Sequence, residues 1–280
     1  DNFYPYGLKE DDPDSQQRVD DVMLRGGVAA LQDLVGVEHV FAVPGNHEYY
    51  SSLLFGAFPF GFSYDREGVR KNVERLGWRG GYAAVGPKVL KLRSPDGQFE
   101  VELILFDSAA ALGGGSASSI AFDLLRSALA RRSSANWRVL AMHHPLETRG
   151  EHGKPRGADE GHGWFHRHLP LRHYQDLCSR AYARFLKRLG SVLESAPPLD
   201  LVLSGHDHDL QVLPLPAGRG WPKVQVVSGA ASKVHGLIND EPLRRRGPDE
   251  YGARQIGASV LTFTASAVRV DFIGEPSLCL

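Results

Sequence analysis

The chain has 280 residues, of which 42% are hydrophobic and 23% are charged, as expected for a globular protein with a buried core. Its formal net charge of −1 at pH 7 gives no general electrostatic reason to expect nucleic acid or an anionic membrane as a partner. Two cysteines exclude a disulfide framework, and no apolar run approaches the ~20 residues that a membrane span needs.

Strand-like and helix-like patterns alternate along the chain. Short apolar runs predict buried strands at 39–45, 101–108, 137–144, 199–206 and 224–231. One helix is predicted over 119–132, with a stripe of Ile120, Leu124, Leu125 and Leu129. A second is predicted over 176–194, with a stripe of Leu177, Ala181, Phe185, Leu186, Leu189 and Leu193. This alternation predicts a layered α/β domain, and a hairpin expected over 261–274 adds antiparallel pairing.

Ligand-type side chains follow three of the predicted strands. Asn46 and His47 follow the first, His143 ends the third, and His206 and His208 follow the fourth. A single histidine after a strand is more often a turn residue than a ligand. The carboxyl ends of strands in an α/β sheet, however, converge on one crevice, where ligands bind. Three strand ends that carry imidazole or amide groups to one crevice therefore indicate a metal site.

These motifs resemble a known family. "DNFYPYG" at 1–7, "GNHE" at 45–48, "MHHP" at 142–145 followed by "EHG", and "GHDHDLQ" at 205–211 followed by "VVSGAA" are similar to the calcineurin-like metallophosphoesterases. Among these, the chain most resembles the purple acid phosphatases, including the tartrate-resistant kind. The resemblance implies a four-layer α-β-β-α sandwich of two mixed sheets, with the metals at the strand ends.

The resemblance also implies a dinuclear metal site. Asp1 would bridge the two metals, and Tyr4 and His208 would bind an Fe(III) ion. The second metal, a divalent Fe, Zn or Mn ion, would be bound by Asn46, His143 and His206. Carboxylate and phenolate oxygens suit a hard trivalent ion, whereas imidazole and amide groups suit the divalent ions.

The same resemblance assigns His47 and His152 to the substrate phosphate rather than to a metal. It favours His143 over His144 as the ligand, because the family's ligating histidine lies two residues before a proline, here Pro145. His144 would then either pack in the core or support the ligating residues. Five neighbouring residues either shape the pocket or are ordinary loop residues: Tyr49, Tyr50, Glu151, Trp164 and His166.

The implied domain covers 1–280 as a single metallophosphoesterase domain with a loop insertion at about 149–175. The family has an earlier strand that ends in a metal-binding aspartate, which this chain lacks. We therefore expect the domain to be N-terminally incomplete, the retained part of a longer protein. A secreted or periplasmic location is weakly favoured by the resemblance, and nothing in the sequence indicates an oligomeric state.

The function implied is hydrolysis of a small phosphate ester, most simply by an acid phosphomonoesterase. Two alternatives stay open: a phosphodiesterase or nucleotide hydrolase of the same fold, because the metal ligands do not encode the substrate, and a non-catalytic phosphoesterase-like binding domain, which the missing aspartate would favour.

Overall fold

The computed structural model describes residues 14, 17, 20, 21, 27–49, 86–153, 176–217, 220–231, 234 and 250–274. The helices with described bounds are α2 (Val28–Val35), α4 (Ser108–Leu112), α5 (Gly115–Leu129) and α7 (Arg180–Glu194), with 3₁₀ turns η2 (Val37–His39), η3 (His47–Tyr49) and η5 (Glu151–Gly153). The strands are β1 (Lys88–Arg93), β2 (Glu100–Phe106), β3 (Trp137–Met142), β4 (Leu201–Ser204), β5 (Leu210–Pro214), β6 (Val224–Ser228), β7 (Tyr251–Ala253), β8 (Gly257–Phe263) and β9 (Val268–Gly274).

Seven strands form one mixed sheet in the order β1-β2-β3-β4-β6-β5-β7. The four central strands β2, β3, β4 and β6 are parallel, and β1, β5 and β7 pair antiparallel at the two sides. The central strands are the apolar runs predicted at 101–108, 137–144, 199–206 and 224–231, which confirms those predictions. Strands buried on both faces read as continuous apolar runs, so the sequence signal was strong.

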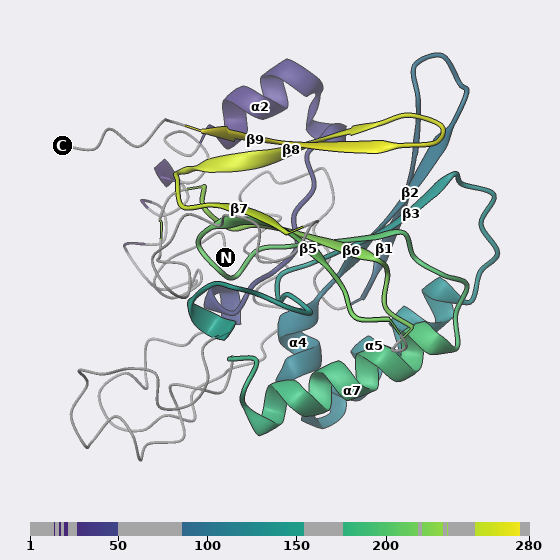
Figure 1. Ribbon diagram of the computed structural model, residues 1–280, viewed down its shortest axis with the longest axis vertical. Helices are drawn as coiled ribbons and strands as arrows, with labels where there is room; N and C mark the ends of the chain where they lie inside the picture. The colour runs from purple at the N-terminus through teal and green to yellow at the C-terminus, as the bar shows by residue number, and fades with distance from the viewer. Residues whose placement is uncertain are drawn as a thin grey trace.

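Helices α4, α5 and α7 cover one face of this sheet (Figure 1). Every second side chain of the central strands points toward them, including Ile104, Phe106, Leu140, Met142 and Val202, which lie in the main core cluster. The helices contribute Phe122, Leu125, Leu129, Tyr182, Phe185 and Leu189 to the same cluster. Ser179 begins α7, because its hydroxyl accepts a hydrogen bond from the backbone N–H of Tyr182.

The other face of the sheet packs against the β8–β9 hairpin. The alternate side chains Val101, Val139, Leu201 and Val226 form a second core cluster with Leu261, Phe263 and Val270. Figure 1 shows α2 beyond this hairpin, so that the layers run helix, sheet, sheet, helix. This order confirms the predicted fold class, and β8 and β9 confirm the predicted hairpin.

Two details of the prediction are wrong. In 39–45, the expected strand is an extended segment with a single bridge residue, Ala42, because a strand needs a continuous neighbour to pair with. In α5, Ile120 and Leu124 are 48% and 41% exposed, and Ala121 and Phe122 face the core instead. The helix is rotated because the stripe through Phe122 buries a large ring against Phe106 and Phe185.

A buried ion pair joins three elements at the end of the sheet where β3 begins. Arg138 Nε donates to Glu102 Oε1 over 2.7 Å, and both side chains are less than a tenth exposed. The guanidinium also donates to the carbonyls of Pro197 and Leu129, at 2.9 and 3.3 Å. Arg138 therefore connects β2, the end of α5 and the segment after α7.

Within the described parts of the chain, no helix has both the length and the apolar character needed to span a bilayer.

Candidate metal centre

The four parallel strands end at one edge of the sheet, and the candidate residues follow them there. Asp107 and Ser108 come after β2, His143 and His144 after β3, and the loop 205–209 after β4. The fourth strand, β6, ends at Ser228 and Gly229. The crevice expected from the strand order therefore exists.

Asn46, His143 and His206 meet at one point of this edge. His143 Nε2 lies 2.8 Å from Asn46 Oδ1 and 3.0 Å from His206 Nδ1. All three residues are less than 6% exposed. Ligands of a single first-row metal ion, each about 2.0–2.2 Å from it, lie roughly 3 Å from one another. The two distances from His143 Nε2 therefore fit an ion with one oxygen and two nitrogen ligands.

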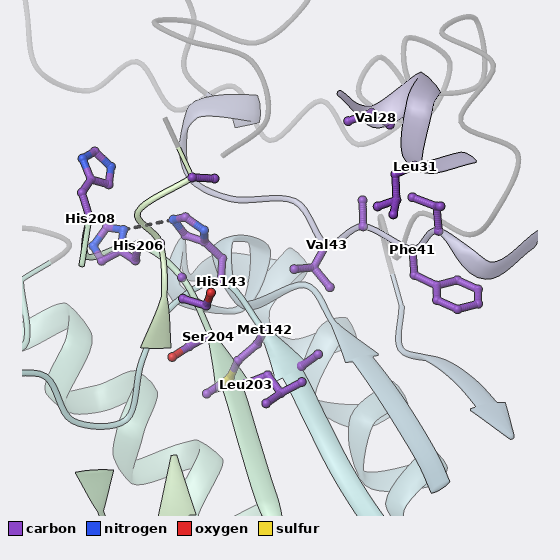
Figure 2. Close-up of a pocket in the computed structure, with 17 residues that line it drawn as sticks. Val28, Leu31, Phe41, Val43, Met142, His143, Leu203, Ser204, His206 and His208 are labelled. Carbon is purple, nitrogen blue, oxygen red and sulfur yellow. Dashed lines mark hydrogen bonds between the residues drawn. The ribbon is translucent and has the colours of Figure 1, made fainter. Parts of the chain in front are cut away.

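Figure 2 shows the His143–His206 contact as a dashed line; the two ring planes are inclined by 74°, and His208 lies beside His206 on the side away from His143. The three histidines line one end of a cavity of about 440 Å³. Apolar side chains, among them Phe41 and Leu203, line the rest of it. The candidate metal centre thus adjoins a largely apolar cavity that is lined by α2, by the segment 40–43 and by the ends of the central strands.

The backbone of the 205–209 loop sets the direction of the His206 ring. His206 has φ = 70°, in the left-handed region that non-glycine residues rarely adopt. The preceding Gly205 N–H donates to the His143 carbonyl at 3.0 Å. A Cβ atom on Gly229 would lie 1.9 Å from the Asp207 carbonyl oxygen, so only glycine permits this approach. The end of β6 therefore holds the loop in its unusual conformation.

Burial keeps His143 and His144 neutral. Loss of hydration lowers the pKa of each imidazole well below its usual value, and the nearby histidines add to this. Neutral imidazoles have a nitrogen lone pair available to a cation. His144 Nδ1 lies 2.9 Å from Ser108 Oγ, and its Nε2 is buried with no hydrogen-bond partner. The donor atoms of His143, His144 and His206 lie within 4.8 Å of one another. The residues present therefore fit a bound metal ion.

The turn that carries Asn46 is held by its own side chains and by the end of β2. Glu48 Oε2 accepts a hydrogen bond of 2.6 Å from the Gly45 N–H. The buried Tyr49 hydroxyl donates to Asp107, whose other oxygen accepts from the N–H of Ala110 at the start of α4. Asp107 therefore fixes the Asn46 turn to the sheet.

His152 lies against the His206 ring, with ring centroids 3.9 Å apart and planes inclined by 25°. Its Nδ1 is 2.8 Å from Asp176 Oδ1, and its backbone N–H donates to Asp207 Oδ1 at 3.0 Å. Burial opposes the charged imidazole, but the hydrogen bond to Asp176 and the charge of Asp207 outweigh it and raise the pKa of His152. His152 therefore differs from His143 in favouring the protonated form.

The loop 205–209 itself carries two buried carboxylates, Asp207 and Asp209. A Cβ atom on Gly150 would lie 2.5 Å from the Asp207 carboxyl carbon and 2.6 Å from Asp209 Oδ2, which shows how closely the two groups approach. Burial and the charge of Asp207 raise the pKa of Asp209 to about 7. Gln211 Nε2 donates to Asp209 at 2.6 Å.

The structure thus brings together Asn46, His143, His206 and His152, places His208 on the same loop, and places His47 next to Asn46 at the start of η3. Asp1 and Tyr4 lie outside the described residues, as do Tyr50, Trp164 and His166. Tyr49 is buried behind the turn, and Glu151 is exposed.

Sequence reasoning missed three residues around the site. Asp107 and Ser108 follow β2 just as His143 follows β3, so the strand-end signal could have found them. Asp176 is 24 residues from His152 in the chain, and no local pattern connects the two.

Comparison with known proteins gives one family match. The sequence model of the calcineurin-like phosphoesterase family matches residues 14–210, more than half of the chain. No curated protein sequence matches the chain significantly. Two solved structures are similar to part of this chain. One, titled "GAP50 the anchor in the inner membrane complex of Plasmodium", is 14% identical, with 67% of this chain and 49% of that chain covered and a TM-score of 0.44. The other, PhoD, is 13% identical, with 66% and 40% covered and a TM-score of 0.36. The chain therefore spans about half or less of the length of these two structures.

Proposed function

Because the chain belongs to the calcineurin-like phosphoesterase family, we propose that it is a metal-dependent phosphoric ester hydrolase, an acid phosphomonoesterase of the purple acid phosphatase type. The observation that carries the proposal is the convergence of Asn46 Oδ1, His143 Nε2 and His206 Nδ1 within 3.0 Å contacts at the carboxyl edge of the sheet. Its substrate is a small phosphate ester.

Two metal ions belong to this proposal. Asn46, His143 and His206 would bind a divalent Fe, Zn or Mn ion, for which one amide oxygen and two imidazole nitrogens are suitable donors. Asp1, Tyr4 and His208 would bind Fe(III), with Asp1 shared between the ions. Such ions supply Lewis-acid chemistry, by neutralising the phosphate oxygens and lowering the pKa of a water molecule.

The chain's own residues then bind the phosphate and move a proton. His47, next to Asn46, and His152, stacked on His206, would donate hydrogen bonds to the phosphate oxygens. A protonated imidazole at either position can donate its proton to the leaving alkoxide. Low pH promotes protonation of these two groups, whereas burial lowers the pKa of His143 and His144. We therefore expect an acidic activity optimum.

Metal analysis and a turnover assay test the proposal. Purified protein should bind transition-metal ions with an Fe(III)–phenolate absorption band, and should hydrolyse 4-nitrophenyl phosphate faster at acidic than at neutral pH. Hydrolysis of bis(4-nitrophenyl) phosphate in preference to the monoester would indicate the phosphodiesterase alternative. Stoichiometric metal without turnover of either ester would indicate a non-catalytic binding domain.

The choice between His143 and His144 has its own test. His143→Ala should lose the second metal, because His143 Nε2 contacts both Asn46 Oδ1 and His206 Nδ1. His144→Ala should retain it, because the ligand role is assigned to His143, although His144 Nε2 is buried without a hydrogen-bond partner and belongs to the same donor cluster. Metal loss in His144→Ala alone would reverse the assignment.

A further inference from the structure

We propose that Asp176 is a positioning residue for His152, which fixes the orientation of the imidazole so that its Nε2 faces the substrate phosphate. The inference rests on the function proposed above, in which His152 contacts phosphate. The carrying observation is the 2.8 Å contact between Asp176 Oδ1 and His152 Nδ1, in a carboxylate and a ring that are both mostly buried, at 17% and 28% side-chain exposure.

The backbone around His152 is already held by other groups. Its N–H donates to Asp207 Oδ1 at 3.0 Å, and its carbonyl accepts from the Leu177 N–H at 3.0 Å. The following Gly153 N–H donates to the Gly150 carbonyl, which closes the η5 turn. With the backbone fixed, the remaining freedom of His152 is rotation of its side chain.

Stacking on His206 restricts the plane of the His152 ring but not which edge of the ring points outward. A 180° turn about the Cβ–Cγ bond keeps the ring in the same plane and exchanges the nitrogen and carbon positions. Only the hydrogen bond to Asp176 distinguishes the two orientations among the contacts described here. It also fixes the tautomer, because a carboxylate accepts and Nδ1 must therefore carry the hydrogen. Nε2 is then the nitrogen left for the substrate.

Asp176 contributes this contact through its side chain alone. Its carbonyl oxygen accepts from the Ser179 N–H at 2.9 Å, which shapes the turn before α7. That bond does not involve the carboxylate, so Asp176→Ala should keep the turn. The substitution therefore separates the positioning role from the local backbone structure.

The test uses two variants of the whole chain, Asp176→Ala and Asp176→Asn, loaded with metal. Loss of a partner that orients a functional histidine typically costs about 10–100-fold in activity. We expect kcat of Asp176→Ala to fall by that factor on an alkyl phosphate such as glycerol 2-phosphate, with KM changed less. On 4-nitrophenyl phosphate the fall should be smaller, because that leaving group needs little help from a proton. Asp176→Asn keeps an acceptor oxygen and should recover most of the loss.

A second readout does not depend on activity. In ¹⁵N-labelled, metal-free protein, NMR of the imidazole nitrogens should show that Nδ1 of His152 carries a hydrogen. The signals of His152 are assigned by their disappearance in His152→Gln. Asp176→Ala should change this pattern, whereas Asp176→Asn should preserve it. Asp271→Ala is the matched control. Asp271 also forms an ion pair, with Arg269 at 2.7 Å, but it lies on β9, which contributes no residue to the candidate site.

The outcomes separate the two proposals. If the unaltered protein binds metal and hydrolyses neither ester, the proposed function fails while the nitrogen pattern still reports on Asp176. If both esters are hydrolysed but Asp176→Ala slows them equally, or leaves the His152 nitrogens unchanged, the positioning role is overturned. An effect of Asp271→Ala equal to that of Asp176→Ala would also overturn it.

Discussion

The buried pair Arg138–Glu102 lends itself to a quantitative test of what holds the sheet to its helices. Replacing Arg138 by Met keeps a long apolar side chain but leaves the Glu102 carboxylate, 5% exposed as a residue, without its cation. Removing one partner of a buried ion pair costs about 3–5 kcal/mol. The carbonyls of Pro197 and Leu129 lose a donor as well, so the upper part of that range is expected.

The second substitution in the cycle is Glu102→Leu. Replacing both charges with apolar side chains of similar volume is often nearly neutral, so Arg138→Met/Glu102→Leu should lie within about 2 kcal/mol of the native protein. Arg126→Met is the matched control, because Arg126 pairs with Asp123 at 2.9 Å on the exposed surface of α5. Surface pairs of that kind contribute only about 0.2–1 kcal/mol.

Urea unfolding followed by circular dichroism measures the free energy of unfolding of all five proteins, namely the four members of the cycle and the Arg126→Met control. The reasoning is refuted if the double variant is destabilised by the sum of the two single losses, since the pair would then have no coupling. It is equally refuted if Arg126→Met costs as much as Arg138→Met, because burial would then make no difference.

Three further predictions concern the metal centre. His47→Asn should lower kcat roughly 10²–10⁴-fold, the usual range for loss of a proton donor, and should leave the metal content unchanged. The loss should be smaller on nitrophenyl esters. Equal losses on aryl and alkyl phosphates would show that His47 only binds phosphate. Tyr49→Phe should weaken metal binding in calorimetry, because the turn loses its hydrogen bond to Asp107, and an unchanged Kd would contradict this. Asp209 should destabilise the metal-free fold as the pH rises from 3.8 to about 7, because its pKa is raised in the folded state and the unfolded chain ionises first. Asp209→Asn should therefore be more stable than the native protein by at most about 4 kcal/mol at pH 7–8 and equal to it near pH 4, as read from thermal unfolding in the presence of chelator.

Much of the sheet could be predicted because its central strands are buried on both faces. Runs such as 137–142 and 201–204 are apolar without interruption, and a polar residue appears where each run leaves the sheet. This change from apolar to polar residues at the end of each strand is what pointed to His143 and His206 as site residues. The segment 39–45 has the same apolar character but one bridge residue only, because strand pairing depends on a neighbour that the local sequence does not contain.

The side chains that support the site were harder to predict. Contacts such as His152 with Asp176, or Tyr49 with Asp107, join positions 24 and 58 residues apart. In α5, Phe122 is buried and Ile120 is half exposed, and Phe122 packs against the rings of Phe106 and Phe185 on other elements. Such information belongs to the tertiary structure rather than to local periodicity.

The position of Asn46 has a thermodynamic consequence. Asn46 comes from a segment with one bridge residue, whereas His143 and His206 come from the ends of paired strands in the middle of the sheet. An ion held by all three would link a weakly paired segment to the most strongly paired part of the molecule. Free ion at 100 times its Kd adds about 2.7 kcal/mol to the stability of whatever must be ordered for binding. Metal availability would therefore control how firmly residues 40–49 are attached to the domain, so that amide hydrogen exchange in this segment would depend on metal concentration.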